Sequence, residues 1–350
     1  MCQNSTRETR VGIYEIDTYI NRRRRKMVKK QLFFVLVLVL VMAAFFSVAP
    51  IIKDASAYEV RWGTAPAGGV WQALGTAMLD DVLKANPDIK GSTLPLGGAA
   101  NVVAINEGKI NTSFSFSTMA AEAWDGKEFF KKYGKLHNIR GLAVLFPEPT
   151  QFAVWADSGI TDVKQLKGKR ITPGPKGSAI APVTRYVLEA YGISLEDVKT
   201  RYMSFSEAGQ QMIDGHIDAI LYGAMAYPAP PIIAVGSQRE IRLLSLSEDA
   251  ITTVLKSHKG LEPYTLAPGS YRGVDYPVKG IAANVVVLCS KDMPDDVAYS
   301  IAKSIADNFD RYTQVTKAIA LGKRGDMGKE IGIPMHPGAL KYYKEMGWIK

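Results

Sequence analysis

The stretch GPKGSAIAPV, residues 174–183, places a glycine turn, a lysine and a serine at the start of an expected helix. A nucleotide-binding phosphate loop needs its Lys directly after the last Gly of G-x-x-x-x-G-K-[ST]. Here Lys176 precedes Gly177 and Ser178 follows it, so the order excludes that loop. A serine N-cap and free backbone N–H groups can instead hold a small anion. A capped helix without a ligand, and a solvated Lys176, are the alternatives.

Two further glycine-rich loops precede helical patterns. Gly68, Gly69 and Val70 open one of them, and Gly98 lies just before Asn101 in the other. Glycine permits positive φ and close packing, so these positions fit either ligand contact or simple packing. Asn101 could cap its helix or donate to a carboxylate.

Small polar and aromatic residues lie where expected strands end. Ser117 and Thr118 follow the alternating run INTSFSF, and Tyr222 ends the run DAILY. Ligands in open α/β sheets bind beyond the carboxyl ends of the strands, although alternating serines also suit a solvated sheet face. Aromatic residues here could contact the apolar part of a ligand, and core packing is their commoner role. The candidate ligand-binding residues are Gly68, Gly69, Val70, Trp71, Gly98, Asn101, Phe116, Ser117, Thr118, Lys176, Gly177, Ser178, Ala179 and Tyr222.

Patterns for catalysis or metal binding are absent from the sequence. The four histidines include no pair at metal-ligand spacing, and no serine lies in a G-x-S-x-G elbow. Cys289, in the apolar run VVVLCS, fits a buried residue that behaves as a small hydrophobe. We therefore expect no catalytic residue, no metal and no cofactor.

The first 57 residues read as an export signal with an N-terminal extension. The basic run RRRRKMVKK precedes the apolar segment Leu32–Val48, and Ala55 and Ala57 form an A-x-A cleavage site before Tyr58. We expect cleavage after Ala57 and a periplasmic protein. An uncut anchor is the alternative, and Met27 is a second candidate start because it opens a shorter basic region.

The net charge argues against nucleic acid as a partner. The whole chain carries +9, but residues 58–350 hold 33 Lys and Arg against 30 Asp and Glu, about +3. Phosphate-backbone binding requires a basic surface that this balance does not supply. Cys2 lies in the leader, so Cys289 is left alone and a disulfide framework is excluded.

The rest of the chain alternates strand and helix patterns and predicts an α/β protein with two lobes. The frame [ED]-G-x-I-[ND] occurs at residues 107–111 and 214–218, each time between a helical pattern and a strand. We therefore expect an internal repeat, in which the chain builds two similar halves. Such halves form a clamp around a ligand. We expect lobe I at residues 58–149 plus 280–350, lobe II at 150–279, and hinge strands near TQFAVWA and GIAANVVVL.

Seven ordered motifs in residues 58–350 resemble the TAXI solute-binding proteins of TRAP transporters. They are WGTAPAGGVWQALG, GGAANVVAINEGKI, ADSGITDVKQLKGKRITPGPKGSA, DGHIDAILY, IRLLSL, APGSYRG and HPGALKYYKEMG. The resemblance implies a type II-like periplasmic-binding-protein fold with a hinge and an interlobe cleft. It also implies a small organic anion, a carboxylate or amino-acid-like molecule, as ligand, and TRAP membrane permease subunits as partners, driven by ions rather than ATP.

The ligand loops depart from that pattern. Ala179 and Ile180 stand where the family often has Gly-Thr, which removes a hydroxyl and adds apolar surface. Two other functions fit the same residues: a ligand-loaded module that signals through a receptor, and an exported hydrolase on a similar scaffold.

Overall fold

A computed structural model describes Met27 and residues 57–65, 70–176 and 178–350. The predicted signal peptide therefore lies outside the described residues, apart from Met27. Residues 57–350 form one unit, and no helix described in it is long and apolar enough to cross a membrane.

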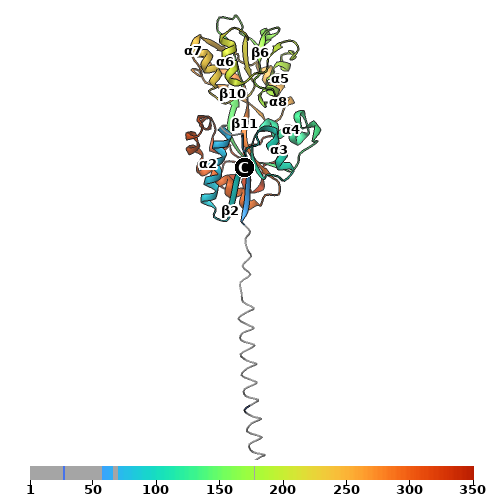
Figure 1. The fold of residues 1–350 in the computed structure, drawn as a ribbon, viewed down its shortest axis with the longest axis vertical. Coiled ribbons are helices and arrows are strands. Elements are labelled where there is room, and N and C mark those ends of the chain that lie inside the picture. The colour runs from blue at the N-terminus through green and yellow to red at the C-terminus, as the bar shows by residue number, and fades with distance from the viewer. Residues whose placement is uncertain (1–26, 28–56, 66–69, 177) are drawn as a thin grey trace, which may run out of the picture. The chain divides into compact units, whose positions relative to one another are not determined.

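The first sheet is built around one long central strand, β11 (Figure 1). This strand pairs antiparallel with β3, β4 and β10, while β1 pairs in parallel with β2 and β3. Successive residues of β11, which point to opposite faces of the sheet, are nearly all buried, and this explains its near-continuous apolar run. The six described strands are β1 (Tyr58–Gly63), β2 (Ile89–Leu94), β3 (Thr112–Phe116), β4 (Ile139–Pro149), β10 (Leu261–Leu266) and β11 (Val278–Ser290).

The second sheet has the strand order β7-β6-β8-β5-β9. Here β6 pairs in parallel with β7 and β8, and β5 runs antiparallel to β8 and β9. The five described strands are β5 (Gln151–Trp155), β6 (Arg170–Thr172), β7 (Lys199–Thr200), β8 (Ala219–Tyr222) and β9 (Ile241–Leu243).

Helices connect the strands and cover both sheets (Figure 1). The described α-helices are α2 (Val70–Ala85), α3 (Gly98–Asn106), α4 (Ser117–Asp125), α5 (Ile180–Ala190), α6 (Phe205–Ile213), α7 (Pro230–Gln238), α8 (Glu248–Ser257), α9 (Asp295–Asp307) and α10 (Pro337–Glu345). The described 3₁₀ helices are η1 (Glu128–Lys132), η2 (Val163–Leu166), η3 (Phe309–Gln314), η4 (Lys317–Leu321) and η5 (Arg324–Asp326).

The late amphipathic pattern DDVAYSIAKSIADNFDRYTQV predicts one long helix, and that prediction is wrong at its end. Helix α9 stops before Asn308, and the 3₁₀ helix η3 follows. The Asn308 side-chain amide donates to the Ser304 carbonyl oxygen at 2.9 Å. Asn competes in this way for the last carbonyls of a helix and favours its termination.

The predicted internal repeat is confirmed by the topology. The segment β1-α2-β2-α3-β3 forms three parallel strands with β1 in the middle, and the segment β6-α5-β7-α6-β8 does the same with β6 in the middle. We call these segments the first half and the second half. The glycine of each shared frame, Gly108 and Gly215, has φ of 72° and 73° just after a helix, the left-handed conformation that suits glycine at a helix C-terminus.

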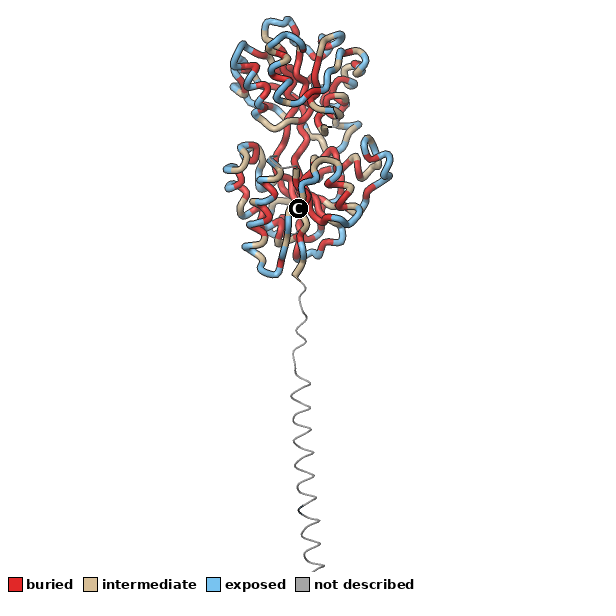
Figure 2. The backbone as a smooth tube through the Cα atoms, in the orientation of Figure 1, coloured by how far each residue is buried: buried red, intermediate tan, exposed pale blue. Residues whose placement is uncertain are grey.

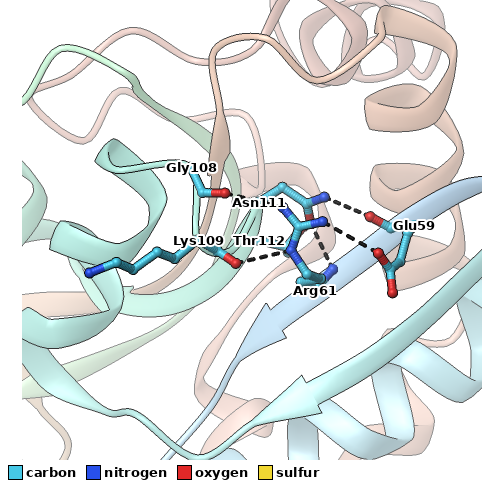
Figure 3. Close-up of polar contacts among 6 residues, drawn as sticks. All are labelled: Glu59, Arg61, Gly108, Lys109, Asn111 and Thr112. Carbon is cyan, nitrogen blue, oxygen red and sulfur yellow. Dashed lines mark hydrogen bonds and ion pairs between the residues drawn. The ribbon is translucent and has the colours of Figure 1, made fainter.

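The contacts at the last position of the shared frame show why either Asn or Asp can occupy it. Asn111 Oδ1 accepts from the Arg61 backbone N–H at 2.9 Å, and the Arg61 guanidinium donates to the Lys109 carbonyl oxygen at 3.0 Å (Figure 3). In the second half, Asp218 accepts from the Arg170 backbone N–H at 2.7 Å and from its guanidinium at 3.1 Å. Each pair ties the middle strand of its half, β1 or β6, to the start of an outer strand, β3 or β8, and is structural.

Buried side chains follow the strands of both sheets, and exposed residues lie mainly on the helices and loops around them (Figure 2). The chain passes between the sheets at Thr150, which separates β4 from β5. Its hydroxyl lies 2.9 Å from the carbonyl oxygens of both Gly223 and Ile281 and donates to one of them at a time. Strand β10 falls within predicted lobe II but pairs in the first sheet. The lobe boundaries stay a prediction.

Candidate functional site

The N-terminus of α5 differs from the expected serine-capped helix. The helix begins at Ile180 and its N-cap is Ala179, which makes no side-chain capping bond. Ser178 therefore lies one residue too early to cap the first turn, and the prediction of a Ser178 cap is wrong. Its Oγ is sealed from solvent and has no hydrogen-bond partner among the described residues. A buried hydroxyl without a partner costs free energy, so Ser178 Oγ is an unsatisfied donor and acceptor beside the start of α5.

Tyr222, at the end of β8, carries a second hydroxyl of this kind. The side chain is fully buried and its Oη has no partner. Burial raises the pKa of the Tyr222 phenol well above its ordinary value. The ring contacts Phe205 edge-on at 5.5 Å, and a Cβ on Gly174 would lie 3.7 Å from it. The phenol thus lies beside the first glycine of the 174–178 loop.

Helix α5 is held against the end of β8 by close backbone approach. A Cβ on Gly223 would come within 2.3 Å of the Thr184 backbone nitrogen, so only glycine fits there. The Thr184 hydroxyl donates to the Leu221 carbonyl oxygen at 2.8 Å and accepts from the Gly223 N–H at 3.0 Å. These contacts position the first turns of α5.

Two of the candidate residues, Trp71 and Phe116, contact each other from different segments. The Trp71 ring lies 5.1 Å from the Phe116 ring, and both pack on the core of the first sheet. Ala179, which precedes α5, packs on the same core. Phe116 also packs on a core cluster of the second sheet. Phe116, with Trp71 beside it, therefore lies where the cores of the two sheets meet.

Other candidates lie at the surface or outside the described residues. Val70 is 52% exposed, and Lys176 is exposed. Gly98 has φ of 50°, and a Cβ there would meet nothing within 4 Å. Glycine is favoured at this position by its positive φ, and not by a lack of room for a side chain. Gly68, Gly69 and Gly177 lie outside the described residues.

Asn101 is already saturated by the protein itself. It is fully buried, and its amide donates to the carbonyl oxygens of Thr64 at 3.2 Å and Phe114 at 3.0 Å. Its Oδ1 accepts from the Gly97 N–H at 3.1 Å. The side chain therefore joins the ends of β1 and β3 to the start of α3, and the donor role predicted for Asn101 is not available in this arrangement.

Ser117 is also occupied. Its Oγ donates to the Gly260 carbonyl oxygen at 2.5 Å and accepts from the Asn284 N–H at 2.8 Å. Along β11, the partner strand changes from β10 to β3 at Asn284. Ser117 accepts from the Asn284 backbone N–H, which neither strand pairs with. The hydroxyl thus replaces a sheet hydrogen bond. Thr118, in the first turn of α4, is 3% exposed.

Sequence reasoning missed two buried carboxyl groups. Burial raises the pKa of Glu148, in β4, to about 8. Burial likewise raises the pKa of Glu122, in α4, to about 7, although the Tyr186 hydroxyl donates to it at 2.7 Å and opposes the shift. Tyr186 belongs to α5, so this bond links α4 to the second half. The available signals were a Glu within the apolar run LAVLFPEPTQFAVW and one within MAAEAW.

No metal-binding arrangement is found in the part of the chain that the structure describes: no three His, Cys, Asp or Glu side chains gather suitably there.

Comparison with solved structures identifies the fold. A TctC solute-binding protein from Polaromonas, solved without ligand, is 17% identical, with 84% of this chain and 99% of that chain covered and a TM-score of 0.52. A Xanthomonas citri protein bound to ATP is 13% identical, with coverage of 82% and 95% and a TM-score of 0.51. The periplasmic aliphatic sulphonate-binding protein from Escherichia coli is 17% identical, with coverage of 82% and 83% and a TM-score of 0.47.

The architecture is therefore the α/β, two-lobed fold of periplasmic binding proteins. At these identities the similarity establishes the fold alone. The model of the NMT1-like family matches residues 62–347. The chain belongs to the NMT1-like family.

Proposed function

We propose that this member of the NMT1-like family is an extracytoplasmic solute-binding protein. It captures a small organic anion between its lobes and delivers it to an ion-coupled permease of the TRAP type, as a TAXI-like subunit. The family match, the binding-protein fold and the seven ordered motifs support this assignment. The basic and apolar leader, with its A-x-A site before Tyr58, supports export to the periplasm and cleavage after Ala57.

The observation that carries the proposal is the pair of sealed hydroxyls in the second half. Ser178 Oγ and Tyr222 Oη lack partners within the described residues, although buried hydroxyls in proteins are normally satisfied. Both lie at the carboxyl end of the second sheet, where ligands bind in folds of this kind. A ligand carboxylate at the start of α5 would supply acceptors, while Trp71 and Phe116 offer an apolar wall.

The mode of capture follows from the composition of the loops. The loops APAGGVW, LGGAANV and GPKGSAI contain no Arg, and their one cation, Lys176, is exposed. Backbone N–H groups and the dipole at a helix N-terminus therefore supply most of the attraction for the anion. The protein groups that hold the anion carry no net charge, so we expect binding of moderate strength. This suits a protein that must release its ligand to a permease.

A thermal-shift screen of the exported protein against carboxylates and amino acids tests the proposal, followed by calorimetry on each hit. A ligand present at 100 times its Kd should stabilise the fold by about 2.7 kcal/mol. The ligand must be recovered unchanged, and its uptake must be lost when the permease is deleted. Binding without any uptake defect would instead favour a signalling module, and turnover of the ligand would favour an enzyme.

A further inference from the structure

Glu148 is a buried carboxyl for which the described residues supply no partner. It is 7% exposed, and burial alone accounts for the shift in its pKa, with no hydrogen bond or charge contributing. The other buried acid, Asp81, pairs with Arg311, and the half-buried Glu122 accepts from Tyr186. A buried carboxyl without a partner is costly in either protonation state, so it requires an explanation.

The strand register shows which way Glu148 faces. It lies directly opposite Ala283 of β11, and opposite residues of an antiparallel pair share a face. Ala283 belongs to the core cluster that includes Val183 of α5. Two residues further along the extended chain, Thr150 directs its hydroxyl to the Gly223 carbonyl oxygen, next to the first turns of α5. Glu148 therefore faces the region where α5 begins.

The carboxyl of Glu148 is not completely enclosed. Its oxygens are absent from the sealed, partnerless atoms of the described residues, which include Ser178 Oγ and Tyr222 Oη. The group combines slight exposure with a lack of partners, as expected for a residue on the wall of a ligand cleft. Thr150, two residues further on, contacts the Gly223 carbonyl oxygen beside α5, so a ligand that extends from the start of α5 past Thr150 would meet this carboxyl.

We propose, resting on the solute-binding function above, that Glu148 is a specificity-determining residue that pairs with a cationic nitrogen of the ligand. The ligand is then a zwitterion, whose carboxylate lies at the N-terminus of α5 and whose ammonium group meets Glu148. An ionised carboxyl only accepts hydrogen bonds, and an ammonium group offers three donors and the opposite charge. A ligand carrying carboxylates alone could accept a hydrogen bond from the protonated Glu148 carboxyl, but it would leave that proton in place, so its binding would release none.

This pairing couples ligand binding to the release of a proton. On the face of Glu148, β11 contributes Ala283 and β10 contributes Leu261, and the core cluster there includes Val183 of α5; none of the three titrates. With its pKa raised to about 8, Glu148 is mostly protonated at pH 7. When the ammonium group arrives, the carboxyl O–H bond breaks, the proton passes to the buffer, and the carboxylate remains in the ion pair.

The test uses the full chain, expressed with its own leader and purified after export. Each common α-amino acid is compared with the 2-oxo acid of the same carbon chain, for example L-glutamate with 2-oxoglutarate, by thermal shift and then by calorimetry at pH 7. Titrations in phosphate and in Tris measure proton exchange. At least one amino acid should bind about 10- to 100-fold more tightly than its 2-oxo acid, the range for a hydrogen bond to a charged group. Binding should release close to one proton.

Glu148→Gln should remove that proton release and reduce affinity for the amino acid by a similar factor. Two matched controls should retain both properties: Glu196→Gln removes an exposed carboxyl, and Glu122→Gln removes a buried one that is already bonded. Equal binding of the 2-oxo acid, or proton uptake, would overturn the inference and leave the solute-binding function standing. If no amino acid, oxo acid or other carboxylate binds, both fail. The comparisons on the unmodified protein hold even if Glu148→Gln does not fold.

Discussion

Replacing Asn101 by Ala should destabilise the protein rather than act on ligand binding directly. The change removes three hydrogen bonds in a fully buried site, to the Thr64 and Phe114 carbonyl oxygens and from the Gly97 N–H. Each bond contributes about 1 kcal/mol net, so the free energy of unfolding should fall by about 3 kcal/mol. Asn101→Asp should cost at least as much, because it keeps the acceptor and turns a carboxylate oxygen towards two carbonyl groups.

Urea unfolding followed by tryptophan fluorescence measures this loss. Asn86→Ala is the matched control, because Asn86 donates one bond, to the Val82 carbonyl oxygen at 2.8 Å, from a half-buried site. It should cost about 1 kcal/mol. If Asn101→Ala left the unfolding midpoint unchanged and abolished ligand binding, Asn101 would be a ligand donor and the structural interpretation would be wrong.

Three further predictions follow from the structure. Ser178→Ala should not lower stability, because its Oγ has no partner among the described residues, and should weaken ligand binding roughly tenfold, a loss that Lys176→Ala should not exceed in calorimetry. Unfolding free energy should fall as pH rises from about 4.5 to about 7, because the folded state holds the Glu122 proton more tightly; Glu122→Gln should lack this part of the fall in urea titrations at several pH values. Gly223→Val should not yield folded protein by circular dichroism, since its Cβ would meet the Thr184 backbone at 2.3 Å.

The architecture could be predicted because it depends on local patterns. The frames at 107–111 and 214–218 place a glycine with positive φ between a helix and a strand, and both halves were recognisable from them. Strand β11 was recognisable from its apolar run, since a strand buried on both faces shows little alternation. The apolar candidates Trp71 and Phe116 do contact each other.

The roles of the polar candidates could not be predicted, because their partners are distant in sequence. Ser117 bonds to Gly260 and Asn284, 143 and 167 residues away. Its position at a strand end suited a ligand, but a break between two partner strands of β11 uses its hydroxyl instead. Glu148 was missed because one Glu in an apolar run does not show which face of the sheet it occupies. That face is defined only by the register of β4 against β11.

The central claim, a two-lobed clamp that closes on a small ligand, is tested most directly by small-angle scattering of the exported protein. Curves are recorded with and without saturating amounts of the tightest ligand from the thermal-shift screen. Our account predicts a smaller radius of gyration with ligand, because the lobes close about the strands near Thr150 and Gly280. Superimposable curves at full saturation would contradict it.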